Sequence, residues 1–328
     1  MIIPESYWAA LILLVVSLLC TGSWASAFKA CGPKWRFELY YFDFVVGVLL
    51  LAFGAAFTLG QFGSELSFLD NIAVTGKRQM GYAAAGGLVF NLGNMLLLAG
   101  VALVGMATAF PAAIGIAMLV RMLWGYTMEG TGSAPLLFGG LALILVATGI
   151  LGKTYISHAN IVAQNLGKKR ARGATKGVVI SLVSGFLLGS SAPVVALSRQ
   201  GDIGLGPYTI AAFFAAGMFL STFVFNIYFM NLPVQGKAVE FGDYFNGGPK
   251  QHLLGLAGGF LFLAGLLAAL TAGAVPTAMQ VDRTLTLALT DGAALVAALW
   301  GLAVWKEFSG SNSGALRNAA IGWLLWAA

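Results

Sequence analysis

Ten apolar segments of roughly 20 residues recur along the chain, which is the length a helix needs to cross the hydrocarbon core of a bilayer. Hydrophobic residues make up 59% of the chain and charged residues only 9%, too few charges for the surface of a water-soluble domain. The sequence therefore predicts an all-α membrane protein with ten transmembrane helices. These are expected at 7–28, 39–62, 81–105, 106–127, 134–152, 177–198, 207–231, 253–273, 279–305 and 314–328.

The ends of this series need separate interpretation. Residues 7–28 look like a signal peptide, but no Lys or Arg precedes them, so we interpret them as the first span. The tenth segment is short, and it is either truncated or does not cross fully. The third and fourth segments nearly touch, which requires a tight turn at Gly105 and Met106. Cys20 and Cys31 would lie about 16 Å apart along a helix, too far for a disulfide.

The basic residues divide unequally between the two sets of connecting loops. One set holds Lys29, Lys34, Arg36, Lys168, Lys169, Arg170, Arg172, Lys176, Lys237, Lys250, Lys306 and Arg317, and the other holds Lys77, Arg78 and Arg199. Positively charged loops stay in the cytoplasm. We therefore expect both termini outside and the longest loop, the basic segment 153–176, inside. The same distribution explains the net charge of +6 without a nucleic-acid partner.

The long loop separates two halves of five segments, 1–152 and 177–328. Short motifs recur at an offset of 165 residues: 96–100 at 261–265, Gly93 at Gly258 and Pro111 at Pro276. Because five is an odd number, the second half would be inverted relative to the first. Inverted repeats are common in secondary transporters, which bind substrate near the membrane midplane. We therefore predict two inverted five-helix repeats and a secondary active transporter that works by alternating access.

Motifs in the early spans and in the ninth are similar to those of a known family. They are 37–44 (FELYYFDF), Gly47 and 57–60 in the second span, then 91–97 (NLGNMLL) and 105–111 (GMATAFP) in the third and fourth. These resemble the ureide permease family. Residues 22–24 and 300–308 are similar to signatures shared with glucose-uptake and rhamnose-type relatives in the drug/metabolite transporter superfamily. The resemblance covers most of 1–127 and the ninth span.

This resemblance implies uptake of a small polar nitrogenous metabolite, a ureide or nucleobase such as allantoin, uracil or a purine. A monosaccharide symporter of the glucose, ribose or rhamnose type is the alternative. Plant members of the family have a central cytosolic insert with a phosphate-loop motif, whereas residues 167–170 do not match that motif. We therefore expect no ATP binding and no cofactor.

Charged residues inside apolar segments are costly and usually face a polar cavity or a partner. Asp43 is either an interfacial residue or a functional one, and it falls within the family resemblance. Asp282 adjoins Arg283, which favours a locally solvated pair. Asp291 and Arg121 form either a structural ion pair or a coupling site, because a carboxylate in a low dielectric has a raised pKa unless a cation offsets it. We expect coupling to protons through Asp43 or Asp291, with sodium as the alternative.

Uncharged polar residues supply the candidate substrate site. Asn91 and Asn94 share a helix face, and their amides suit a nucleobase or ureide edge, a sugar hydroxyl or a helix–helix contact. Trp24, beside Ser23, either stacks on a planar ring or packs in the core. The remaining candidates are Ser190 and Ser191 before Pro193, with Tyr228 and Asn226 as weaker ones.

The other motifs favour structural roles. Gly185 with Gly189 and Gly255 with Gly259 form GxxxG pairs, which predict close helix contacts, with dimerisation as a lesser alternative. The chain is therefore expected to be a monomer or a homodimer in the lipid bilayer. His158 and His252 are expected at interfaces, and no metal site is expected. The sequence contains no HExxH or GxSxG constellation and no repeated filter, so an enzyme or a channel is not favoured.

Overall fold

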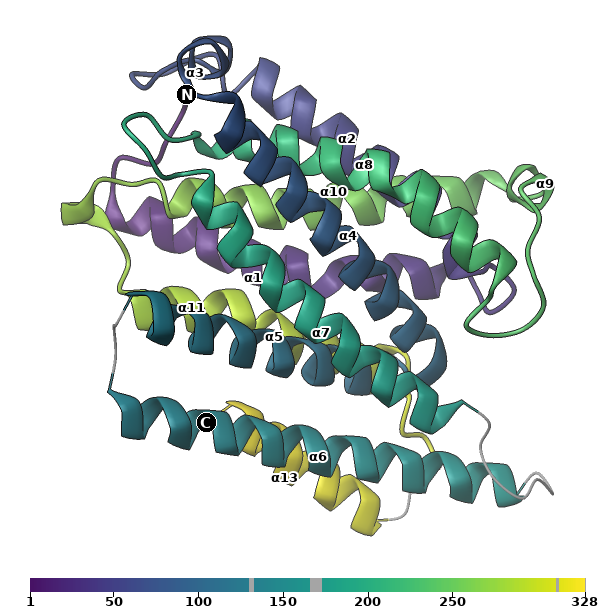
Figure 1. Cartoon of the computed structure of the whole chain (residues 1–328). Coiled ribbons are helices and arrows are strands. Elements are labelled where there is room, and N and C mark those ends of the chain that lie inside the picture. The colour runs from purple at the N-terminus through teal and green to yellow at the C-terminus, as the bar shows by residue number, and fades with distance from the viewer. Residues whose placement is uncertain (130–132, 166–172, 311–312, 328) are drawn as a thin grey trace. The chain divides into compact units, whose positions relative to one another are not determined.

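The structure is a computed structural model that describes residues 1–129, 133–165, 173–310 and 313–327. The described residues form helices and no strands, and nine of the helices they contain are long and apolar enough to span a membrane. These are α1 (Tyr7–Ala30), α2 (Phe37–Phe57), α4 (Lys77–Val104), α5 (Met106–Glu129), α6 (Ala134–Asn165), α7 (Ala174–Leu197), α8 (Pro207–Asn231), α10 (Pro249–Ala272) and the segment Arg283–Val304 (Figure 1). The prediction of an all-α multi-pass membrane protein is confirmed.

The shorter elements lie between these helices or follow them. They are α3 (Phe68–Val74), α9 (Gly242–Phe245), the 3₁₀ turn η1 (Thr277–Met279) and α13 (Ser313–Ala327). The segment Arg283–Val304 is itself divided into α11 (Arg283–Asp291), α12 (Ala293–Leu299) and a π-helical turn, η2 (Trp300–Val304). We had predicted one continuous segment over 279–305. Instead Asp282 caps the start of α11, and the helix is interrupted at Gly292.

Two connections between the helices, the turn at Gly105 and the loop after α6, can be compared with the predictions. The turn at Gly105 is confirmed, because this residue has φ +77°, a conformation that glycine adopts without strain, between the end of α4 and the start of α5. The loop predicted from residue 153 was placed too early, because α6 continues to Asn165. Residues 153–165 contain no glycine or proline, and hydropathy marks where a span leaves the apolar core rather than where its helix ends. The basic cluster Lys168, Lys169, Arg170 and Arg172 lies outside the described residues.

The chain folds as two compact units. Unit 1 contains Met1–Asn91 and Ser191–Ala293, and unit 2 contains Leu92–Ser190 and Ala294–Ala328. Both α4 and α7 therefore contribute residues to each unit. These units do not coincide with the halves 1–152 and 177–328, and the inverted repeat stays a prediction.

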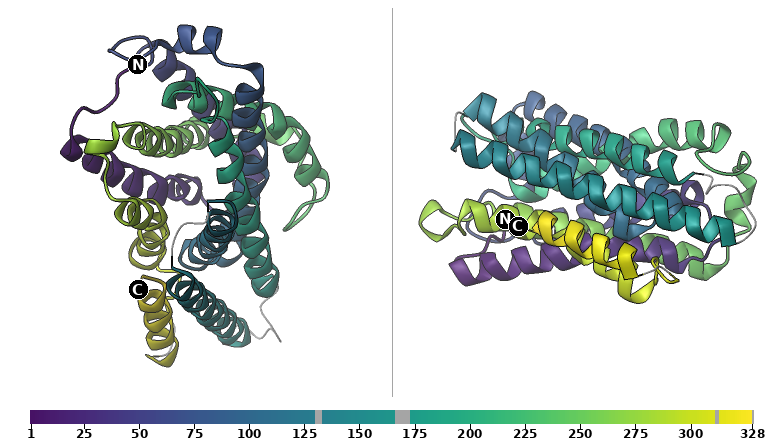
Figure 2. Two further views of the ribbon diagram at one scale, coloured as in Figure 1. Left: turned by 60° about the vertical axis from the view of Figure 1, so that its left-hand side comes forward. Right: turned by 90° about the horizontal axis from the view of Figure 1, so that it is seen from below.

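Within each unit, glycines let helices approach closely. In unit 1, α10 packs along α1 and α2 (Figures 1 and 2), and a side chain at Gly255 or Gly259 would collide with α2 at Asp43 or Phe44. In unit 2, α13 lies beside α6 in all views, and a side chain at Gly185 or Gly189 would collide with α5. The predicted helix contacts of both GxxxG pairs are confirmed.

Candidate substrate and coupling sites

Asn91 is the centre of a hydrogen-bond network inside unit 1. Its Oδ1 accepts from the Tyr41 hydroxyl of α2 at 2.8 Å. Its Nδ2 donates to Ser221 Oγ at 2.9 Å and Thr222 Oγ1 at 3.0 Å, both on α8. Those two hydroxyls in turn donate to backbone carbonyls of α8, so both can accept from the amide. The amide of Asn91 thus joins α2, α4 and α8. Of the roles predicted for Asn91, this conformation shows the hydrogen bonds between helices.

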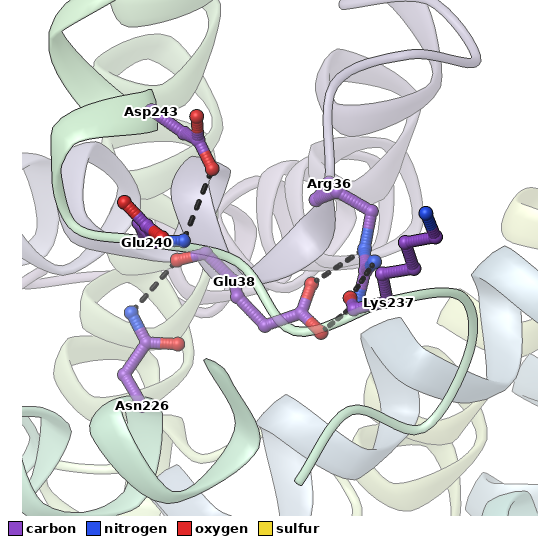
Figure 3. A network of polar contacts seen from close by, with 6 residues as sticks. All are labelled: Arg36, Glu38, Asn226, Lys237, Glu240 and Asp243. Carbon is purple, nitrogen blue, oxygen red and sulfur yellow. Dashed lines mark hydrogen bonds and ion pairs between the residues drawn. The ribbon is translucent and has the colours of Figure 1, made fainter. Parts of the chain in front are cut away.

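One turn further along α8, Asn226 keeps an unused acceptor. Its Nδ2 donates to the backbone carbonyl of Glu38 at 2.7 Å (Figure 3). Because a carbonyl can only accept a hydrogen bond, the nitrogen of the amide must face Glu38, and the amide oxygen points away from Glu38. That oxygen, Asn226 Oδ1, is buried without a hydrogen-bond partner, and so is the hydroxyl of Tyr40 on α2. A buried polar atom left unpaired costs about 1–3 kcal/mol. Such atoms need an explanation, and a bound ligand is one.

A buried ion pair lies at the start of α2. Glu38 is fully buried and accepts two hydrogen bonds from Arg36, at 3.1 Å from Nε and 2.5 Å from Nη2. Arg36 also donates to the backbone carbonyl of Lys237 at 3.0 Å, which ties this end of α2 to the loop after α8 (Figure 3). The bidentate geometry compensates for part of the cost of burying the Glu38 carboxylate, while the Arg36 side chain is partly exposed. The pair therefore fixes the α2 residues around Asn226.

Asp43 is the hub of a second polar cluster in unit 1. The carboxylate is 6% exposed, and it accepts from Tyr244 Oη of α9 at 2.5 Å and lies 2.8 Å from His252 Nδ1 of α10. Burial, the hydrogen bond to Asp43 and the charge of Asp43 raise the pKa of the Tyr244 phenol above its ordinary value. His252, which we expected only at an interface, is a direct partner of Asp43. Sequence reasoning missed this contact because the two residues are far apart in the chain.

Trp24 belongs to an aromatic cluster in unit 1. It is 2% exposed, and its ring centroid lies 4.9 Å from Phe44 and 6.0 Å from Phe262. Phe90 packs on Phe262 at 5.2 Å. Ser23 is only partly buried beside Trp24. The cluster packs α1, α2, α4 and α10 together through buried rings.

The remaining predicted residues are divided between the two units. Tyr228 is 59% exposed, pointing away from the interior that its neighbour Asn226 faces. Ser191 is buried in unit 1, whereas Asn94, which is buried, and Ser190, which bonds the Phe186 carbonyl at 2.7 Å, belong to unit 2. Substrate contact by these side chains stays a prediction.

The charged candidate residues do not form one cluster within either unit. Asp282 is exposed, and it accepts from the backbone N–H groups of Thr284 and Leu285 as the N-cap of α11. These hydrogen bonds lower the pKa of its carboxyl. Asp291 is buried at 7% exposure in unit 1, and Arg121 belongs to unit 2. The predicted pairing of Arg121 with Asp291 therefore stays a prediction.

Unit 2 uses buried and partly buried polar groups to complete the start of α5. Glu307 accepts from the backbone N–H groups of Met106 and Ala107, both at 2.8 Å. Pro111 has no N–H for the Ala107 carbonyl, and the indole of Trp323 donates to that carbonyl at 3.4 Å. Trp326 donates to the Pro111 carbonyl at 3.1 Å. That α13 supplies these donors could not be predicted from the sequence.

Comparison with known proteins fits this architecture. A solved crystal structure aligns over 97% of this chain and 94% of its own, with a TM-score of 0.54 and 16% identity, so the two share a fold. The fold and its apolar helices define a multi-pass integral membrane protein.

The sequence matches agree on one family of similar proteins. The model of the ureide permease family matches residues 40–176. Ureide permease 2 of Arabidopsis thaliana is 22% identical over 95% of this chain and 93% of its own, and ureide permease 1 of the same plant is 23% identical over 94% and 92%. The chain is thus similar in sequence to the ureide permease family, whose members are transporters and not enzymes.

Proposed function

We propose that the protein is a secondary active transporter that takes up a ureide or a nucleobase-like compound, and that the substrate binds inside unit 1. The observation that carries this proposal is the unpaired acceptor of Asn226, buried one helical turn from the Asn91 network. Ureides and nucleobases carry adjacent N–H and C=O groups. An N–H of the substrate would pair with Asn226 Oδ1, and a substrate carbonyl would accept from the Tyr40 hydroxyl.

The aromatic cluster supports the same substrate class. Trp24, Phe44 and Phe262 present ring faces near one another, and planar ureides and nucleobases stack on aromatic rings. A monosaccharide, the alternative, also binds amides and aromatic faces, but the names of the matched relatives favour ureides. In this conformation the amide of Asn91 is fully engaged. Donation from Asn91 to the substrate would therefore require the hydroxyls of α8 to separate from Asn91, which fits alternating access.

We assign proton coupling to Asp43 within this proposal. An ionised Asp43 accepts from Tyr244 and pairs with His252, which holds α2 against α9 and α10. A proton that binds to the carboxylate removes its charge and one acceptor position, so the carboxyl loses part of its hold on the two partners. Cys31 and Tyr40 are further titratable groups that interact electrostatically with Asp43, and Lys250 interacts with Cys31. Protonation on one side and release on the other would link the proton to the change of access.

Uptake by the purified protein in proteoliposomes tests the function. We expect saturable uptake of labelled allantoin or uracil that an inwardly directed proton gradient accelerates, and weak competition by glucose, ribose or rhamnose. Saturable sugar uptake without ureide uptake would replace the proposal by its alternative. Acceleration by a sodium gradient alone would remove proton coupling.

A further inference from the structure

A cavity of about 290 Å³ opens at the end of unit 1 where α7 turns into α8. Its lining includes Glu65, Asn71, Arg199, Gly206 and Gly273. All of them belong to unit 1, and none belongs to the buried amide network or to the Asp43 cluster. The charge distribution over the loops predicts that this end faces outside the cell. A volume near 300 Å³ is at the small end of ligand sites, which suits a small metabolite.

The charged residues that line this cavity are Arg199, Glu65 and the N-terminal Met1, whose ammonium donates to the backbone carbonyls of Glu65 and Leu66 at 2.9 and 3.2 Å. Among the described residues, Arg199 forms no ion pair or side-chain hydrogen bond, and the same holds for Glu65. The Arg199 side chain keeps access to solvent, although the protein around it lowers the pKa of the guanidinium by desolvation. A guanidinium presents parallel N–H donors that match a carboxylate, and a carboxylate accepts from amide or ureido N–H groups. The cavity therefore offers one group for an anion and another for a hydrogen-bond donor.

The backbone around these charges is held in place. Asn71 of α3 donates to the Gly204 carbonyl at 3.2 Å and accepts from the Gly206 N–H at 3.0 Å. Leu205 donates to the Ser198 carbonyl at 3.0 Å, and Gln79 donates to the Gln200 carbonyl at 3.2 Å. The loop that carries Arg199 is thus fixed at several points. A rigid loop reduces the ordering cost of binding.

We propose that this cavity binds ureido acids, small molecules that carry a carboxylate on a ureide skeleton, before they enter the interior of unit 1. Arg199 pairs with the carboxylate, and Glu65 accepts from the ureido N–H groups. The inference rests on the proposed ureide function for its substrate class. It adds an outer site that distinguishes charged from neutral ureides.

Isothermal titration of the full chain in lipid nanodiscs tests the site with two probes. N-carbamoylglycine is a ureido acid, and hydantoin is its neutral ring-closed counterpart. We expect R199Q to weaken N-carbamoylglycine binding by about tenfold or more. R199K should weaken it less, because Lys keeps the positive charge but lacks the two parallel N–H donors of the guanidinium. E65Q should weaken it by a few-fold, and hydantoin binding should change by less than about threefold in all variants.

R78Q is the matched control, because Arg78 lies at the start of α4 and bonds Tyr82 rather than lining the cavity. Unchanged N-carbamoylglycine affinity in R199Q would overturn the inference, as would equal losses in R199Q and R78Q or no binding to the parent protein. Thermal unfolding of each variant separates loss of the site from loss of the fold. If R199Q selectively weakens N-carbamoylglycine binding while proteoliposomes take up no ureide, the outer site stands and the proposed transport function fails. If ureide uptake proceeds and R199Q binds N-carbamoylglycine normally, only the outer site fails.

Discussion

The interior of unit 1 and the start of α5 in unit 2 use buried polar groups in opposite ways. At α5, the carboxylate of Glu307 and the indoles of Trp323 and Trp326 each pair with a backbone group that the helix leaves open. In unit 1, Asn226 and Tyr40 keep buried atoms without partners, although hydrogen-bonding groups lie on the neighbouring turns. Polar groups that complete a helix end stabilise the fold. Buried polar atoms without partners also occur at Thr108 in α5 and at Thr148, so we infer a role beyond the fold for Asn226 only because it lies one turn from the Asn91 network.

The largest effect is expected at Glu307. E307A leaves two N–H groups at the start of α5 without an acceptor, which should lower the free energy of unfolding by about 2–4 kcal/mol. E307Q keeps one acceptor oxygen and should lose about half as much. Equilibrium unfolding in mixed detergent micelles measures both, with E240A at an exposed glutamate as the control. A loss no greater than that of E240A would show that the cap contributes nothing.

The next effect concerns coupling rather than stability. D43N keeps the shape of the side chain but removes its titration, so the variant should exchange labelled substrate across the membrane and lose accumulation driven by a pH gradient. Counterflow and gradient-driven uptake in the same proteoliposomes separate the two activities. D202N, at an exposed aspartate of unit 1, should keep both. Accumulation by D43N at the parent's level would assign coupling elsewhere, with Asp291 as the next candidate.

A smaller effect is expected at Trp24. W24F keeps an aromatic face against Phe44 and Phe262 but reduces its area, so substrate affinity should fall by a few-fold, about 0.5–1 kcal/mol. Titration with allantoin or uracil measures the change, and the thermal unfolding temperature serves as the control for packing. N94A should also weaken binding if Asn94 contacts substrate. Affinities equal to the parent in both variants would place the site away from these residues.

The smallest effect is expected at Tyr228. Its side chain is 59% exposed, so Y228F should leave uptake and stability within experimental error of the parent. The comparison with Asn226, two residues earlier on α8, tests whether the interior of unit 1 or its outer face carries function. A marked loss of uptake in Y228F would assign function to the outer face.

Much of the fold could be predicted from the sequence, because hydropathy alone limits where membrane-spanning helices can lie. The segment predicted at 207–231 matches α8 at both ends, and the turn at Gly105 follows from two spans that almost touch. The end of α6 was misplaced because polar helix residues after Gly152 carry no stop signal.

The candidate sites were less predictable, since they depend on which side chains meet. Asp43 was identified from its charge, but its partner His252 is 209 positions away in the chain. Tyr228 and Asn226 ranked equally in the sequence, because the face that a residue presents within an entirely apolar helix leaves no periodic signal. Only packing shows that Asn226 faces the interior.

The most direct test of the account is the affinity of N226L for a ureide. This substitution keeps a similar volume but removes both the unpaired oxygen and the hydrogen bond from Nδ2 to the Glu38 carbonyl, so the free energy of unfolding should fall by no more than about 1–2 kcal/mol. T148V is the control, because Thr148 also carries a buried unpaired hydroxyl but lies in unit 2. Isothermal titration with allantoin or uracil should show affinity at least about tenfold weaker in N226L and unchanged in T148V. Equal affinity in N226L and the parent would contradict the claim that substrate binds inside unit 1 at Asn226.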